Sequence, residues 1–299
     1  MISHHLDRTL GFTIPERHAR GRLARLGPTL TDILSAHGYP PAIERLLAEA
    51  LVLAALFGAT LKDSSGQLTL QAQAQGGAID LLVCDFRGGE MRGYVRHDPD
   101  RVADLPADPS LVDLFGQGYL AITFDLATAG ERYQGIVPLE GASLAEAAQS
   151  YFAQSEQIPS LVRIGVARSD AGIIAGGLLL QHLPEGEEGR ERLHTRLSHP
   201  EWDSVAMLGG SVRADELADP QLPLETLLWR LFNEEEVRIL PGIDLRRGCR
   251  CDPDHVGRVI SRFPAADRAE MVGADGLIRV DCEFCARTFV VRTDHEAEA

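Results

Sequence analysis

The sequence predicts an α+β protein in three parts: a mostly antiparallel sheet domain with helices, a helical linker and a small C-terminal zinc-binding domain. In the first part, strand-like runs follow one another with few helices between them, which favours an antiparallel sheet over a doubly wound parallel one. A charged stretch follows, and four of the five cysteines then fall in the last 51 residues. We therefore expect an α/β core at 1–182, a metastable linker at 183–248 and a zinc-binding switch at 249–299.

Composition narrows the class of protein. The chain has 299 residues, 44% hydrophobic and 24% charged, which is ordinary for a globular protein of roughly two domains. Its net charge is −15 and none of the three parts is basic. Because phosphate binding needs concentrated positive charge, nucleic acid is not expected as a partner. No signal peptide or membrane-spanning run is evident, so we expect a cytoplasmic protein that does not bind membranes.

The first part opens with a helix and a series of strands. Residues 43–57 carry apolar side chains at helical spacing, and 68–75 (LTLQAQAQ) alternate as in a half-buried strand. Gly76 and Gly77 then mark a turn. Four more strands are expected in a meander: IDLLVCDF (79–86), RGYVR (92–96), YLAITFDL (119–126) and YQGIVPL (133–139).

A capped helix and two long strands complete this part. Ser143 followed by Glu146 has the pattern of a capping box, in which both side chains satisfy free backbone amides. The helix is expected over 144–157, and Pro159 limits it. Two apolar runs then read as paired strands: LVRIGVARS (161–169) and AGIIAGGLLLQHL (171–183).

The linker, 183–248, is rich in charge. Its apolar residues form small helical patches, which can cover a neighbouring surface but are too sparse for a core of their own. We therefore expect it to fold only when docked on another part of the chain. The alternative is a plain helical linker with solvated charges, which composition alone favours. The clearest patch is Leu224, Leu227, Leu228, Leu231 and Phe232.

The terminal cysteines are spaced as metal ligands. The sequence reads C-R-C, then thirty residues, then C-E-F-C, and four thiolates match the closed tetrahedral site of a structural Zn²⁺ ion. We expect one zinc ion in the reduced protein; unrelated free or disulfide-bonded cysteines are the alternative. Four protein ligands leave no position for a substrate water, which argues against zinc hydrolysis. The predicted ligands are Cys249, Cys251, Cys282 and Cys285.

Metal and fold should be coupled in this segment. Its apolar side chains are few, and structural zinc supplies about 10 kcal/mol or more to modules of this size. Thiolates are also the form of sulfur that peroxide and hypochlorite attack, so oxidation would remove the ligands and the fold together. Four nearby arginines could help to hold negative sulfur or could equally be surface residues: Arg246, Arg247, Arg250 and Arg287.

Two other residues could join this chemistry. His255 lies near the first pair, but with four cysteines available we interpret it as a surface histidine. Cys84 lies within the apolar run LLVCDF, so we predict a buried strand residue instead of a reactive thiol.

The chain resembles the 33 kDa chaperonin family, the bacterial redox-regulated holdases (heat shock protein 33), over nearly its whole length. One segment, EEGRERLHTRLSHPEWD (187–203), is longer than the family pattern. The residues that carry the resemblance are GATLKDSSGQLTLQAQAQG (58–76), YFAQSEQIPS (151–160), GGLLLQHLP (176–184), LLWRLFNEEEVR (227–238), CRC (249–251) and CEFC (282–285).

The resemblance implies a redox-regulated, ATP-independent chaperone and no enzyme. In such proteins the reduced, zinc-bound form is inactive. Oxidation forms disulfides, here Cys249–Cys251 and Cys282–Cys285 with the second pair first, and releases zinc. The switch and then the linker unfold, and the protein forms a homodimer and binds unfolding client proteins.

Two rival functions remain. A thiol–disulfide oxidoreductase could use the CEFC pair, although this motif lacks the helix-start setting of thioredoxin-like sites. A constitutive zinc ribbon that binds RNA or another partner is the second, and the acidic charge of the chain opposes it.

Overall fold

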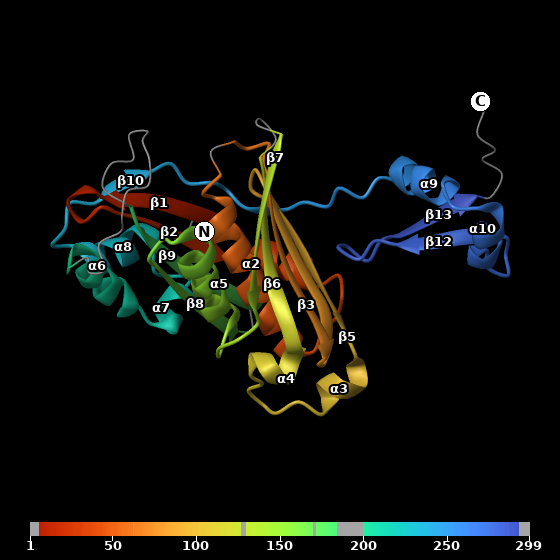
Figure 1. Ribbon diagram of the computed structural model, residues 1–299, viewed down its shortest axis with the longest axis horizontal. Coiled ribbons are helices and arrows are strands. Elements are labelled where there is room, and N and C mark those ends of the chain that lie inside the picture. Colours follow the sequence, from red (N-terminus) through yellow and green to blue (C-terminus); the bar gives the residue numbers. More distant parts are fainter. Residues whose placement is uncertain (1–5, 62, 127–129, 170–171, 184–199, 293–299) are drawn as a thin grey trace.

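The α+β class predicted from the sequence is confirmed. A computed structural model describes residues 6–61, 63–126, 130–169, 172–183 and 200–292, so most of the lengthened segment 187–203 lies outside the described residues. Two large sheets and one small sheet are present in this part of the chain, with helices around and between them (Figure 1). No helix among the described residues is both long enough and apolar enough to span a membrane.

The six-stranded sheet has the order β11-β5-β4-β3-β6-β7, and all its pairs are antiparallel except β11 with β5. The predicted strands are all present, but the simple meander is wrong. After β5 the chain crosses back through two short helices, so that β6 pairs with β3. The strands are β3 (Gln67–Gly76), β4 (Ile79–Arg87), β5 (Glu90–His97), β6 (Gly116–Leu126), β7 (Glu131–Pro138) and β11 (Arg246–Arg247).

The five-stranded sheet has the order β10-β1-β2-β9-β8 and is antiparallel. Its long hairpin, β8 with β9, is the pair of apolar runs predicted from the sequence. The remaining strands do not alternate clearly in the sequence and were not predicted. The strands are β1 (Arg8–Ile14), β2 (Ala19–Leu26), β8 (Ser160–Ser169), β9 (Gly172–His182) and β10 (Arg238–Leu240).

Helix α2 (Pro41–Gly58) packs against both sheets and is buried over most of its surface. The capped helix is also present as α5, where Ser143 accepts from the Glu146 amide and the Glu146 carboxylate accepts from the Ala142 amide. The other helical segments of this part are α1 (Pro28–Leu34), α3 (Pro99–Ala103), α4 (Leu111–Phe115), α5 (Leu144–Tyr151), a 3₁₀ turn (Pro15–Arg17) and a π turn (Phe152–Glu156).

Helices of the predicted linker cover the outer face of the five-stranded sheet, as expected for a docked segment. They are α6 (Pro200–Gly210), α7 (Ala214–Leu217) and α8 (Leu224–Phe232). They contribute most of a second hydrophobic cluster, separate from the one around α2. The sheet supplies Leu10, Phe12, Ile14, Ala19, Leu23, Leu178 and Leu180, and the helices and the loops between them supply Val205, Val212, Leu217, Leu222, Leu224, Leu227, Leu228, Leu231 and Phe232.

A buried arginine fastens these helices to the sheet. Arg25 of β2 is 0% exposed, and its guanidinium donates to the main-chain oxygens of Glu216 (3.0 Å), Leu217 (2.8 Å) and Leu222. These carbonyls close the C-terminal end of α7 and the loop after it. Burial lowers the pKa of Arg25 to about 10, so the side chain still carries its charge at neutral pH.

The chain ends in a small module of two helices and a two-stranded sheet. These elements are α9 (Pro253–Ser261), α10 (Ala265–Met271), β12 (Leu277–Asp281) and β13 (Thr288–Arg292). Within the described residues of this module, the buried hydrophobic side chains are Ile260, Ile278 and Phe289. A core of this size agrees with the expectation that the module needs another source of stability.

Candidate metal centre

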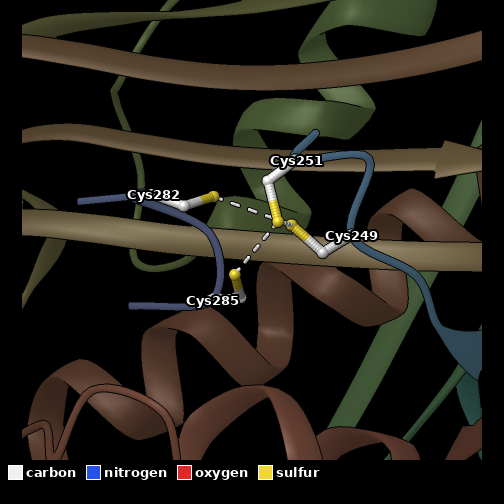
Figure 2. A group of neighbouring side chains, drawn as sticks. All are labelled: Cys249, Cys251, Cys282 and Cys285. Carbon is white, nitrogen blue, oxygen red and sulfur yellow. Dashed lines mark hydrogen bonds between the residues drawn. The ribbon is translucent and has the colours of Figure 1, made fainter. Parts of the chain in front are cut away.

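The four predicted cysteines meet at one point, and their sulfur atoms all lie within 4.8 Å of one another (Figure 2). The Sγ atom of Cys249 is 3.3 Å from that of Cys251 and 3.6 Å from that of Cys282, and Cys251 is 3.5 Å from Cys285. All four are free thiols and half-buried.

Local backbone structure explains why the two pairs converge. The CEFC motif forms the turn between β12 and β13, where the amides of Cys285 and Ala286 both donate to the Cys282 carbonyl, at 3.2 and 2.8 Å. Ala286 has a φ of +53°, which closes this turn. The CRC motif directly follows β11, whose pairing with β5 continues through a 2.9 Å bond from the Gly248 amide to the Met91 carbonyl.

This donor set fits a tetrahedral metal ion of the zinc type. With zinc–sulfur bonds of about 2.3 Å, the sulfur atoms of a regular tetrahedron lie about 3.8 Å apart. The observed separations of 3.3–3.6 Å approach this value and are well above a disulfide bond. The residues that could hold such an ion are therefore Cys249, Cys251, Cys282 and Cys285.

The electrostatics of the cluster also call for a cation. Burial raises the pKa of Cys251 to about 12, together with the neighbouring thiols, and raises that of Cys282. Burial acts in the same direction on Cys249, but hydrogen bonds from the Cys251 amide and the other thiols outweigh it and lower the pKa of Cys249 to about 7. Cys251 and Cys282 therefore hold their protons more tightly than free thiols do, and four thiolates together need a positive ion at their centre.

The four predicted arginines divide into two groups. Arg247 and Arg287 line an opening of about 280 Å³ together with Cys249, Cys251 and Cys285. Arg246 instead pairs with Glu90 at 3.0 Å, and Arg250 donates to Gln67 on β3. Arg250 also lines a second opening, of about 290 Å³, with Cys251 and Cys282, so of this set only Arg246 lies outside both openings in the described part of the chain.

The two remaining sequence predictions are confirmed. His255 is exposed and lies outside the group of four candidate ligands. Cys84 on β4 is 0% exposed, and burial raises the pKa of its thiol well above the usual value. A buried, protonated thiol is a poor nucleophile, so Cys84 has no part in the chemistry of the cluster.

A contact that sequence reasoning missed joins this centre to the six-stranded sheet. Phe284, between the two cysteines of CEFC, packs its ring edge to face against Tyr94 of β5 with centroids 4.9 Å apart. The Arg92 guanidinium lies 3.9 Å from the centre of the same ring. The Phe284 carbonyl also lies 3.3 Å from Nε2 of His37. The partners are distant in sequence, so no local pattern predicts them.

Arg92 is itself fixed in place. Its guanidinium forms a 2.7 Å ion pair with Asp85 on β4, and the other Asp85 oxygen accepts from the Thr69 hydroxyl at 2.7 Å. The surface that receives Phe284 is therefore organised by the sheet and not by the terminal module.

Comparisons with known proteins agree with this architecture. The sequence profile of the family described as Hsp33 protein matches residues 7–292. The 33 kDa chaperonin of Caulobacter vibrioides (strain NA1000 / CB15N) is 40% identical over 291 residues, covering 95% of this chain and 94% of that protein. The 33 kDa chaperonin of Pseudoalteromonas atlantica is 33% identical over 283 residues, covering 95% and 91%.

A solved structure has the same fold. The crystal structure of the 33 kDa chaperonin (heat shock protein 33 homolog) from Thermotoga maritima matches with a TM-score of 0.80 over 97% of this chain and 95% of that one. The two sequences are 22% identical, so this match concerns the fold alone.

Proposed function

The chain belongs to the Hsp33 protein family, and we propose that it is a redox-regulated holdase, a chaperone that binds unfolding proteins without ATP only after oxidation. In this proposal, residues 1–182 form the chaperone core, 183–248 the metastable linker and 249–299 the switch. The observation that carries it is the convergence of four free thiols in a module with little core of its own, directly after a linker that covers an apolar sheet face.

In the reduced state, Cys249, Cys251, Cys282 and Cys285 would hold one Zn²⁺ ion. The ion would supply the positive charge that keeps four sulfur atoms deprotonated and closely packed. With its ligands in place the module stays folded, and the linker stays anchored at its C-terminal end. The reduced form is therefore the inactive one.

Oxidation converts the ligands to disulfides. Each pair of thiolates gives up two electrons as its sulfur–sulfur bond forms, and one hydrogen peroxide takes them up with two protons to become two water molecules. Pairing within Cys249–Cys251 and Cys282–Cys285, with the second pair first, follows the family pattern, and the 3.3 Å separation of the first pair supports it. Disulfide sulfur cannot retain the ion, so ligand loss and metal release occur together.

Loss of the switch removes one anchor of the linker. Helices α6 to α8 pack their apolar residues against the five-stranded sheet in one shared cluster. Their release would uncover an apolar face of the kind that binds unfolded chains, and would allow two copies to associate as a homodimer. Client proteins in the course of unfolding are the proposed partners.

The direct test is suppression of heat-induced aggregation of citrate synthase by two forms of the protein. The reduced, zinc-loaded form is expected to be inactive, and the peroxide-treated, zinc-free form active. Bound metal and free thiols are measured in the same titration. Equal activity of the two forms would refute the switch.

Two cysteine variants sharpen this test. Cys282→Ser is expected to weaken zinc binding and to make linker release independent of peroxide. Cys84→Ser is the matched control and is expected to bind zinc and respond to peroxide like the unmodified protein, because its side chain lies in the core. Loss of switching in the Cys84→Ser variant would contradict this assignment.

A further inference from the structure

The last part of the linker lies along the edges of both large sheets. Residues 238–248, which we name the edge strap, contain β10 and β11. Strand β10 pairs with β1 between Gly11 and Thr13, and β11 pairs with β5 at Glu90 and Met91. The strap therefore covers one edge of each large sheet: the β1 edge of the five-stranded sheet and the β5 edge of the six-stranded sheet (Figure 1).

Backbone hydrogen bonds continue between and beyond these two short strands. They join nitrogen and oxygen atoms at 2.7–2.9 Å, from Thr9 to Ile243, from Leu245 to Asp7, from Arg246 to Gly89 and from Gly248 to Met91. The strap thus uses the same main-chain groups that an added strand would use.

Side chains hold β10 only weakly. Arg238, Ile239 and Leu240 are all exposed, with Ile239 at 57% and Leu240 at 40%. A three-residue strand held mainly through its backbone is marginal alone. Its position depends on the neighbours that anchor the strap: the buried Phe232 of α8 before it, and after it Leu245, which is 4% exposed in the cluster around α2, and the cysteine cluster.

We infer that release of the edge strap uncovers the edge of β1, and that an extended segment of an unfolding protein adds to this edge as a new strand. The inference rests on the proposed function and names the contact by which clients are held. Unfolding proteins expose unpaired backbone amides and carbonyls, and an edge strand recognises these groups whatever the side chains are. This mode of binding suits a chaperone without a fixed client sequence.

The structure favours β1 over β5 as the receiving edge. The side chains of Leu10, Phe12 and Ile14 on β1 belong to the face that the linker helices cover. An added strand would therefore gain apolar contacts beside the backbone pairing. On β5, by contrast, the Val95 amide already donates to the Tyr39 hydroxyl at 2.8 Å.

A proline tests the backbone contact. The Thr9 amide points to the strap, and the period of two along a strand places the amides of Gly11 and Thr13 on the same edge. Thr13→Pro removes one of these donors and leaves the pairing with β2 intact. In the oxidised protein we expect about fivefold weaker suppression of citrate synthase aggregation, the effect of one lost hydrogen bond.

The matched control is Ile136→Pro on β7. The Leu139 amide donates to Gly118 of β6, so alternation places the Ile136 amide on the open edge of the other sheet, where Pro138 already lies. This variant also loses one amide at a sheet edge, but on a strand that the inference does not involve, so it should keep full holdase activity. Equal activity of the two proline variants would overturn the inference.

Hydrogen exchange in the unmodified protein decides the matter without a variant. Amides of β1 are expected to lose protection on oxidation and to regain it when reduced, carboxymethylated α-lactalbumin is added as a permanently unfolded probe. Protection that appears only in the linker or elsewhere on the sheet would overturn the inference. Protection of β1 without the probe, accompanied by a doubled mass, would also overturn it, because a second copy would then occupy the edge.

Failure of the inference differs from failure of the proposed function. If the oxidised protein suppresses aggregation while β1 stays unprotected in the probe complex, only the edge contact is wrong. If oxidation neither activates the protein nor exposes β1, the proposed switch is wrong as well.

Discussion

Phe284 connects the chemistry of the thiols to the surface of the core. It is set between two predicted ligands, and its ring is held by Tyr94 and Arg92 of β5. Any rearrangement of the turn that brings Cys282 and Cys285 into a disulfide moves this ring. Oxidation of the sulfur atoms would therefore change a contact with the six-stranded sheet directly, without involving the linker.

Phe284→Ala should therefore loosen the docking of the terminal module without removing the metal. An aromatic pair and a cation–π contact together contribute about 1.5 kcal/mol, so the docking equilibrium constant should fall by roughly tenfold. We expect unchanged zinc content, a larger radius of gyration by small-angle X-ray scattering and activation at a lower peroxide dose.

Phe263→Ala is the control for that experiment. Phe263 lies in the same module and is 39% exposed, and it makes no ring contact with another aromatic or with a guanidinium among those described. If both variants dock and respond to peroxide equally, Phe284 has no coupling role.

At the level of elements, the linker helices depend on the sheet below them. Their apolar side chains fill one cluster with β1, β2 and β9, and Arg25 binds three carbonyls at the end of α7. The arginine supplies donors that water would otherwise provide. Removal of its guanidinium takes a donor from each of the three; the Asp219 amide still donates to the Glu216 carbonyl, but the buried Leu217 and Leu222 carbonyls lose the donor that binds them here.

Arg25→Met should release the linker without any oxidant. The unpaired carbonyls cost about 2–4 kcal/mol, which is large for a segment docked by a small cluster. We expect the reduced variant to suppress aggregation and its tryptophan emission to shift to the red, since Trp202 is half-buried in the docked linker, whereas Trp229 is already 66% exposed. The ring of Trp202 packs against His182 when docked.

Arg22→Met separates this effect from general loss of stability. Arg22 lies on the same strand but on the face opposite to Arg25, and it donates to the Ala59 carbonyl at 2.9 Å. Its loss should lower the melting temperature but leave the reduced protein inactive. If the reduced Arg25→Met protein keeps its linker docked and stays inactive, the hydrophobic cluster alone holds the linker.

The elements also show how far the sequence could lead. Spacing of Cys249, Cys251, Cys282 and Cys285 predicted the site because ligand geometry imposes a local pattern. Strand β2 escaped prediction because Arg20, Arg22 and Arg25 obscure its alternation, although Arg25 points inward. The return of β6 to β3 and the Phe284 contact join residues far apart in the chain, and such pairings leave no periodic signal.

At the level of the whole molecule, stability is divided unequally. The core packs around α2, whereas the terminal module buries Ile260, Ile278 and Phe289 among its described residues. If the four thiols hold zinc, the metal supplies about 10 kcal/mol or more to the module and almost nothing to the core. The two ends of the chain should therefore unfold under different conditions.

Removal of the metal by a chelator in the presence of a reductant should unfold the module and release the linker, but leave the core folded. We expect amide signals from 249–292 to collapse, those of α2 and the six-stranded sheet to persist, and added zinc to restore the first set. The linker tryptophans should report release in the same titration. A module that keeps its signals without metal would contradict the assignment of the cluster as its main support.

The course of the edge strap also sets a direction. Gly248 stands beside Cys249, and the hydrogen bonds that precede it in the chain follow one another along β5 and then β1, with α8 further back. Under the proposed function, loss of the metal would therefore break these bonds one at a time, starting next to the cysteines. The strap would open backwards along the polypeptide towards the helices, and the apolar face would be uncovered last.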